Sequence, residues 1–265
     1  MTGGDDSAVA ATRTALHRDG LVGIERAAVR AWPAGEMRVV DGWLWRYSGG
    51  GSQRANSVSA LSYDGRDVER TIDAIEALYR AHGAPVRFQV GFPLSQPDDL
   101  DQRLAARGYE IHDPVTTLLK PVAPIAAPTD VVLRGAPSDG WLSVYLANVT
   151  PDRRPFAMAI LERVPGPRVF AEVVRDGAVI ATALGVFHEN TVIAECVGTA
   201  STARRQGAAA TVMRVLESWG AGLGAHTIGL QAVTTNMPAQ GLYAALGYVP
   251  AGTYHYRFLD SRTAG

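Results

Sequence analysis

The sequence predicts a mixed α/β fold, in which helices cover a sheet that has both parallel and antiparallel strands. Apolar residues recur at helical spacing over residues 68–81 and 209–219, and a strand-like run follows each stretch, at 86–91 and 227–233. The dipeptide Asp176-Gly177 lies between two strand-like runs and predicts a tight hairpin. With 265 residues, 47% of them hydrophobic, the chain can bury a substantial core in one large domain or two small ones.

Helix-like and strand-like segments alternate in the first half of the chain. We expect a helix at 24–31, strands at 43–47 and 56–61, a helix at 68–81, a strand at 86–91, a helix at 100–106 and a strand at 109–119. The helix at 68–81 is the clearest, because Val68, Ile72 and Ile75 fall on one face. A Pro- and Ala-rich stretch predicts a linker at 123–129, and the polar, glycine-rich start predicts a partly mobile segment at 1–20.

The second half begins at residue 130 and contains the hairpin. We expect a strand at 131–133, helices around 141–148 and 153–163, strands at 168–175, 178–188 and 191–198, a helix, a strand at 227–233, a short helix and a final strand at 248–259. The turn dipeptide Glu189-Asn190 separates two of these strands. The predicted domains are therefore residues 21–122 and 130–265.

Composition limits the possible functions. A formal charge of −1 argues against a general nucleic-acid binder, which needs a basic surface. A single cysteine, Cys196, permits no intrachain disulfide and suggests a reducing compartment. The start of the chain lacks a signal-peptide pattern, and no apolar run reaches the ~18 residues of a membrane helix, so we expect a soluble, cytoplasmic protein. The six histidines show no metal-ligand spacing.

The most informative segment runs from Glu195 to Ala209, where a strand leads through an Arg-x-x-Gly-x-Ala turn into a helix. Backbone N–H groups at a helix N-terminus point outward at the positive end of the helix dipole, so such a turn can receive a pyrophosphate. Gly207 and Ala209 keep the turn free of bulky side chains, while Arg204 and Arg205 add positive charge.

A second motif follows about 29 residues after that glycine, from Asn236 to Tyr248. Asn236 suits the N-cap of a short helix, Pro238 is tolerated in its first turn and Gly247 suits the residue after its C-cap. Tyr243 lies on the apolar face of this helix. On its own this pattern fits a core tyrosine whose hydroxyl reaches the surface.

Together, the two motifs resemble the acyl-CoA-binding half of the GNAT superfamily of N-acetyltransferases. The resemblance implies acetyl-CoA as the co-substrate, with its pantetheine arm on the backbone of a splayed strand and Tyr243 near the thioester sulfur as proton donor. The implied cofactor-binding residues are Val197, Gly198, Thr199, Arg204, Arg205, Gln206, Gly207, Ala208, Ala209, Asn236 and Tyr243.

Two residues are candidates for the base that deprotonates an acceptor amine. In several GNAT subfamilies a glutamate on the corresponding strand acts as the base, which favours Glu195; a structural carboxylate paired with an arginine is the alternative. Strand alternation predicts that Ile193, Val197 and Thr199 share the face of Glu195 and that Cys196 is a core residue on the opposite face. His255 in the last strand is the competing base.

The two halves resemble each other, which indicates a tandem GNAT protein. Residues 86–90, Val-Arg-Phe-Gln-Val, and residues 228–232, Ile-Gly-Leu-Gln-Ala, each precede a helix that ends in Gly-Tyr. The first copy lacks the phosphate turn, because Ser62-Tyr-Asp-Gly-Arg66-Asp stands in its place, and Leu104 replaces the tyrosine. We therefore expect one active domain and one degenerate, truncated copy.

The degenerate copy is expected to form the other wall of the acceptor cleft. Arg46, Arg54 and Asn56 are candidate substrate-binding residues there, with an arginine holding a substrate carboxylate, alongside Glu195 and His255; packing roles are the alternative. The leading prediction is acetyl transfer to a primary amine of a small molecule, such as an amino acid or an amine-bearing antibiotic. A longer acyl group and a catalytically idle acyl-CoA sensor are the alternatives, and the protein is either a monomer or a homodimer.

Overall fold

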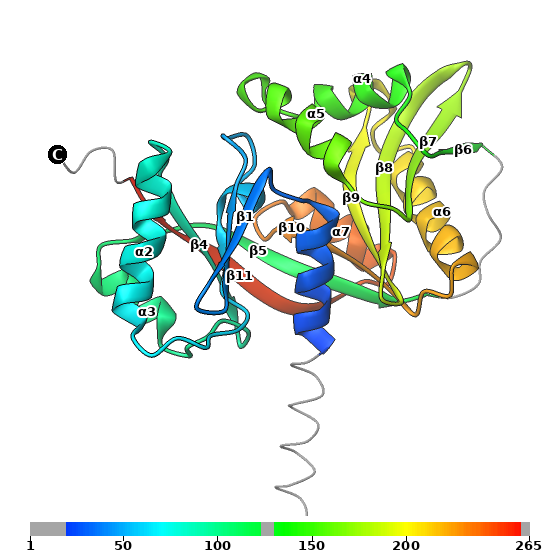
Figure 1. The fold of residues 1–265 in the computed structure, drawn as a ribbon. Helices are drawn as coiled ribbons and strands as arrows, with labels where there is room; N and C mark the ends of the chain where they lie inside the picture. Colours follow the sequence, from blue (N-terminus) through cyan, green and yellow to red (C-terminus); the bar gives the residue numbers. More distant parts are fainter. Residues whose placement is uncertain (1–19, 123–129, 261–265) are drawn as a thin grey trace, which may run out of the picture.

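The computed structural model describes residues 20–122 and 130–260, which form a single 11-stranded mixed sheet covered by helices (Figure 1). The expectations for residues 1–19 and for the linker at 123–129 lie outside the described residues. The strand order is β1-β2-β3-β4-β11-β5-β10-β9-β8-β7-β6. None of the helices in the described part of the chain is long and apolar enough to cross a membrane.

The first half follows the predicted order of elements, with one additional edge strand. After a helix at residues 20–31, it contains β1 (Glu36–Val40), β2 (Trp43–Tyr47), the short 3-10 helix η1 (Arg54–Asn56), β3 (Val58–Ser59), α2 (Val68–Ala81), β4 (Val86–Phe92), α3 (Leu100–Ala106) and β5 (Glu110–Pro121). The sequence did not predict β1, because four of its five residues are exposed and give no alternation. The segment at 56–61 forms a strand only at two residues.

The second half also has the predicted elements. They are β6 (Val131–Arg134), α4 (Asp139–Ala147), η2 (Pro151–Arg153), α5 (Arg154–Arg163), β7 (Arg168–Arg175), β8 (Ala178–His188), β9 (Thr191–Thr199), η3 (Ser201–Ala203), α6 (Ala208–Gly222), β10 (Thr227–Val233), α7 (Met237–Ala245) and β11 (Val249–Leu259). One core cluster lies on the face that α6 and α7 cover, and another on the face of α4, α5 and the helix at 20–31.

The two halves exchange their last strands. β11 lies between β4 and β5 and pairs antiparallel with both, while β5 lies between β11 and β10 (Figure 1). The repeated segments are β4 and β10, and in the order β4-β11-β5-β10 they occupy equivalent places. Each half is therefore completed by a strand from the other, and one sheet runs through both halves.

The sheet splits between β9 and β10. These parallel strands pair over only three residues, from Thr191↔Thr227 to Ile193↔Gly229, and then diverge. A β-bulge at Cys196, whose φ is 53°, coincides with the divergence and shifts the register between β8 and β9. The end of β9 thus has a free edge on the side that faces β10.

Candidate active site

The predicted phosphate turn lies between β9 and α6. Arg205 has a φ of 61° and Gly207 a φ of 78°, so the backbone turns sharply and α6 begins at Ala208. Glycine adopts this left-handed conformation without strain, and no atom lies within 4 Å of where its Cβ would be. Within residues 20–122 and 130–260, no side chain caps the N-terminus of α6, so its first N–H groups are available to an anion.

The side chains of the turn surround this helix end. Arg204, Arg205 and Gln206 are exposed, and Gln206 Nε2 donates to the carbonyl oxygen of Thr202 at 3.1 Å. Ala208 is buried, which leaves only its backbone available to a ligand, and Ala209 is half-buried. The turn therefore combines two exposed positive charges with an open backbone.

The free edge of β9 continues this site toward the centre of the sheet. Val197, Gly198 and Thr199 follow the bulge; Gly198 and Thr199 pair with β8 on one side and have no β10 partner on the other. Asn148 Nδ2 lies 3.5 Å from the carbonyl oxygen of Thr199. A Cβ at Gly198 would come within 3.3 Å of Asn148 and of Thr182, so glycine keeps the strand clear of the helical layer.

The alternation predicted along β9 is wrong beyond Glu195, because of the bulge at Cys196. Cys196 packs with Ile193 against the α4 side of the sheet and shares a hydrogen bond with the Tyr145 side chain, whereas Val197 packs with the α6 cluster. Cys196 therefore does not lie on the face opposite Ile193, and Val197 does not share the face of Ile193. The reason is that a bulge inserts one extra residue and inverts the alternation beyond it. Burial raises the pKa of the Cys196 thiol well above its usual value, which keeps it protonated.

Glu195 is held by an arginine from the other half of the chain. Arg54 Nη1 and Nη2 donate to the two carboxylate oxygens of Glu195 at 2.6 and 2.5 Å, and the guanidinium carbon lies 5.4 Å from the ring centroid of Trp32. Burial alone would lower the pKa of Arg54, but the charge of Glu195 outweighs it and raises that pKa. The predicted arginine partner of Glu195 is thus present, while each carboxylate oxygen retains a further lone pair.

A buried hydrogen-bond relay extends from Arg54 into the first half. Arg54 Nη1 lies 3.4 Å from Gln231 Oε1, Gln231 Nε2 donates to Glu25 at 2.8 Å, and Thr117 donates to the other oxygen of Glu25 at 2.7 Å. Tyr254 also donates to Gln231 Oε1, at 3.2 Å. Burial raises the pKa of Glu25, and the hydrogen bonds from Thr117 and Gln231 act in the opposite direction.

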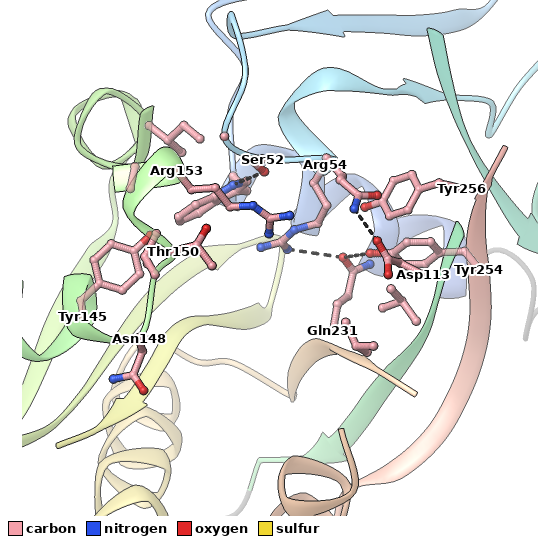
Figure 2. Close-up of a pocket in the computed structure, with 18 residues that line it drawn as sticks. Ser52, Arg54, Asp113, Tyr145, Asn148, Thr150, Arg153, Gln231, Tyr254 and Tyr256 are labelled. Atoms are coloured by element: carbon pink, nitrogen blue, oxygen red, sulfur yellow. Dashed lines mark hydrogen bonds between the residues drawn. The ribbon is translucent and has the colours of Figure 1, made fainter. Parts of the chain in front are cut away.

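A cleft with a volume of about 440 Å³ lies in front of Arg54, between the helical layer of the second half and the exchanged strands. Figure 2 shows one side formed by Tyr145, Asn148, Thr150 and Arg153, and the other by Arg54, Asp113, Gln231, Tyr254 and Tyr256. Trp32 adds a fourth aromatic side chain to the lining. The cleft is large enough for a small amine.

Tyr243 lies on the α7 side of the split. Only 7% of it is exposed, and its ring meets that of Tyr248 edge-on at 5.8 Å. Burial, and secondarily the charge of Glu195, raise the pKa of Tyr243 to about 12. The phenol therefore keeps its proton at neutral pH and lies within electrostatic reach of Glu195. Asn236 caps α7 as predicted, because its side chain accepts from the N–H of Ala239 at 3.3 Å.

Of the five predicted substrate-binding residues, Arg54 lines the cleft, whereas Arg46, Asn56, Glu195 and His255 do not. Arg46 is 1% exposed and its guanidinium donates to Ser57 and Gln89. The Asn56 amide holds the glycine loop through the carbonyls of Gly50 and Ser52 and the N–H of Ser48. Their polar atoms are already satisfied within the protein.

His255 points away from Glu195, because alternation along β11 turns Tyr254 and Tyr256 into the cleft and His255 outward. Its Nε2 lies 2.8 Å from Asp101 of α3, and Arg257 donates to the same carboxylate. The hydrogen bonds from Arg257 and then His255 lower the pKa of Asp101. The structure thus does not bring the two candidate bases together. Among residues 20–122 and 130–260, no group of three or more His, Cys, Asp or Glu side chains is arranged to hold a metal.

The split sheet, the left-handed glycine turn and the tyrosine helix coincide with similarity to known acetyltransferases. Residues 21–259 match the family described as "Probable histone acetyltransferase Rv0428c C-terminal". The chain belongs to the GNAT superfamily of N-acetyltransferases. It is 30% identical over 250 residues to the uncharacterized N-acetyltransferase YobR of Bacillus subtilis, covering 88% of this chain and 96% of that protein. It is accordingly an acyltransferase enzyme.

Solved structures with little sequence identity share the GNAT fold. A GCN5-related N-acetyltransferase from Kribbella flavida has a TM-score of 0.67 at 16% identity, over 90% of this chain and 95% of that chain. A tandem GNAT protein from the clavulanic acid biosynthesis pathway has a TM-score of 0.59 at 15% identity, over 80% of this chain and 76% of that chain. The tandem GNAT prediction is confirmed at the level of the fold.

Several residues of the site were missed by sequence reasoning. Glu25 lies on an amphipathic helix where a lone carboxylate gives no signal, and Arg153 and Asn148 belong to a helical segment without a recognisable motif. Gln231 did carry a signal, since Gln89 occupies the same place in the repeated segment. The repeat indicates duplication, but the sequence alone does not show that Gln231 belongs to the site.

Proposed function

We propose that this GNAT enzyme transfers an acetyl group from acetyl-CoA to a primary amine of a small molecule. The observation that carries the proposal is the split between β9 and β10, which has the free N-terminus of α6 at one end and the Glu195–Arg54 pair at the other. The thioester site and the amine site thereby lie along one continuous path.

The residues present fit coenzyme A. The uncapped N–H groups of α6 and the exposed Arg204 and Arg205 suit a pyrophosphate, and the open space around Gly207 leaves room for it. The unpaired edge at Val197–Thr199 offers backbone groups to the amides of the pantetheine arm, as an added strand would. When bound, acetyl-CoA supplies an activated acetyl group whose carbon–sulfur bond breaks as the amine nitrogen forms the new bond.

Protonated amines are poor nucleophiles, so the acceptor must lose a proton before it reacts. We assign Glu195 as the base that takes this proton, through a water molecule. A water is needed because both carboxylate oxygens already accept from Arg54 and only their outer lone pairs remain. Tyr243 gives its proton to the departing thiolate. The raised pKa of about 12 keeps the phenol protonated, so its hydroxyl is available to donate to the sulfur as the carbon–sulfur bond breaks.

The experiment that tests the proposal is calorimetric titration of the purified protein with acetyl-CoA, followed by a thiol-release assay over amino acids and amine antibiotics. Binding together with CoA release in the presence of one class of amine supports the proposal. If a longer acyl-CoA binds and releases CoA faster than acetyl-CoA does, the transferred group is that longer acyl group and not acetyl. Failure to bind any acyl-CoA would refute it, and binding without release over the whole panel would favour an acyl-CoA sensor.

A further inference from the structure

Two arginines line the cleft, Arg54 and Arg153. Among the described residues, the guanidinium of Arg153 has no hydrogen-bond or ion-pair partner. Arg54, the other arginine of the lining, is occupied by Glu195 on both nitrogens. Arg153 closes η2 and is exposed, so its guanidinium is free to meet a ligand. Asp152, its neighbour in the chain, accepts from the Thr150 side chain and from the N–H of Arg153, and the charge of Arg153 also helps to lower its pKa.

The fixed charges of the cleft favour a singly charged anion beside Arg153. The Arg54–Glu195 pair is neutral as a unit, and Asp113, on the opposite side, adds a negative charge that accepts from Gln53. A dianion such as phosphate needs more positive charge than a single guanidinium, and Asp113 opposes it. A carboxylate matches one guanidinium in both charge and shape, because two parallel N–H groups meet its two oxygens.

We propose that the acceptor amine carries a carboxylate, which Arg153 binds while the amine faces Glu195 and the free edge of β9. This inference rests on the proposed acetyl transfer and names its substrate class, an amino acid. Trp32, Tyr145 and Tyr254 line the same cleft as Arg153, and their aromatic surfaces suit an acceptor with an apolar or aromatic body. The carboxylate thus fixes the direction of the acceptor, so that its amine enters the split first.

The test compares acceptors that differ only in the carboxylate, such as phenylalanine with phenethylamine and tyrosine with tyramine, within a panel of the standard amino acids and a lysine peptide. Arg153→Gln removes the charge and Arg153→Lys keeps it. Arg163→Gln is the matched control, because Arg163 is an exposed arginine at the far end of α5 that does not line the cleft. Thiol release gives kcat and KM, and calorimetry with the N-acetylated amino acid measures binding without turnover.

In each pair, the wild type should prefer the acceptor with the carboxylate by about tenfold or more in kcat/KM. A charged hydrogen-bonded pair supplies a difference of this size. Arg153→Gln should raise KM and weaken product binding about ten- to hundredfold, with kcat little changed, and should abolish the preference; Arg153→Lys should restore part of it and Arg163→Gln should behave as wild type.

Equal use of both members of each pair, preference for the lysine peptide, or an Arg153→Gln variant like Arg163→Gln would overturn the inference. If acetyl-CoA binds but no amino acid releases thiol, the inference also fails while the co-substrate site stands. If acetyl-CoA does not bind at all, the proposed function itself fails.

Discussion

Gln89 of β4 and Gln231 of β10 donate to the same carboxylate oxygen of Glu25, at 3.1 and 2.8 Å. The two glutamines hold equivalent positions in the repeated segments, and the side-chain oxygen of each accepts a hydrogen bond from an arginine, Arg46 for Gln89 and Arg54 for Gln231. The helix at residues 20–31 thus supplies one carboxylate that joins the first half of the chain to the second half. The Arg46–Gln89 hydrogen bond is thus the counterpart, in the first repeat, of the Arg54–Gln231 hydrogen bond at the site.

Removing the Glu25 carboxylate leaves three buried donors, on Thr117, Gln89 and Gln231, without an acceptor. Glu25→Ala should therefore lower the free energy of unfolding by about 3 kcal/mol, as estimated for unsatisfied buried groups. Urea denaturation measures this change. Glu110→Gln, at an exposed position of β5, is the control and should have almost no effect; an equal loss in both variants would contradict the role of the relay.

The raised pKa of Glu25 also predicts a pH dependence of stability. The folded state binds this proton more tightly than the unfolded state, so the contribution of Glu25 is greatest below the unfolded pKa and declines as pH rises through the folded pKa. Glu25→Gln cannot titrate and should lack that decline. Denaturation midpoints measured from acid to neutral pH in both proteins check the difference; parallel curves would exclude a raised pKa.

Tyr243→Phe should reduce kcat about a hundredfold, as loss of a general acid does, with acetyl-CoA affinity within about twofold of wild type. Its ring partner provides the control. The Tyr248 hydroxyl is buried and has no hydrogen-bond partner among the residues that the structure describes, so Tyr248→Phe should leave turnover intact. Thiol-release assays measure kcat, and calorimetry measures the affinity for acetyl-CoA. A parallel fall in affinity would assign Tyr243 a structural role.

The Arg54–Glu195 pair should couple strongly. Replacing one partner by Gln leaves the other as an uncompensated charge in a largely buried place. Each single variant should therefore lose more free energy of unfolding than the double variant, with a coupling energy of about 2–3 kcal/mol. Denaturation of the four proteins of the cycle measures this value. Additive effects would mean that the pair contributes nothing. Glu195→Gln should in addition lower kcat while acetyl-CoA still binds.

Strand exchange predicts that neither half folds alone. A fragment of residues 130–265 lacks β5, which leaves β10 and β11 unpaired along facing edges, and a fragment of residues 21–122 lacks β11. Unpaired edges expose backbone groups and promote aggregation. Co-expressed fragments should assemble and bind acetyl-CoA, whereas single fragments should aggregate. A well-dispersed NMR spectrum from either fragment alone would contradict the exchange.

The sequence predicted those parts of the fold that depend on local patterns. Apolar spacing located α2 and α6, and backbone chemistry located the left-handed Gly207 and the Asn236 cap. It could not predict the bulge at Cys196, because no glycine marks it. Nor could it place Arg153, whose importance comes from the tertiary packing of α5 opposite the exchanged strands, or separate the free arginine from the two that are already bonded.

The exchange of β5 and β11 has a consequence for synthesis on the ribosome. Residues 249–259 form the last strand that the structure describes, yet they fill the gap between the two strands that end the first half. The half that is made first must therefore wait, with the edges of β4 and β5 unpaired, until residues 249–259 have emerged. A copy that has lost its phosphate turn and its tyrosine still cannot be deleted, since its partner would lose a strand from the middle of its own sheet.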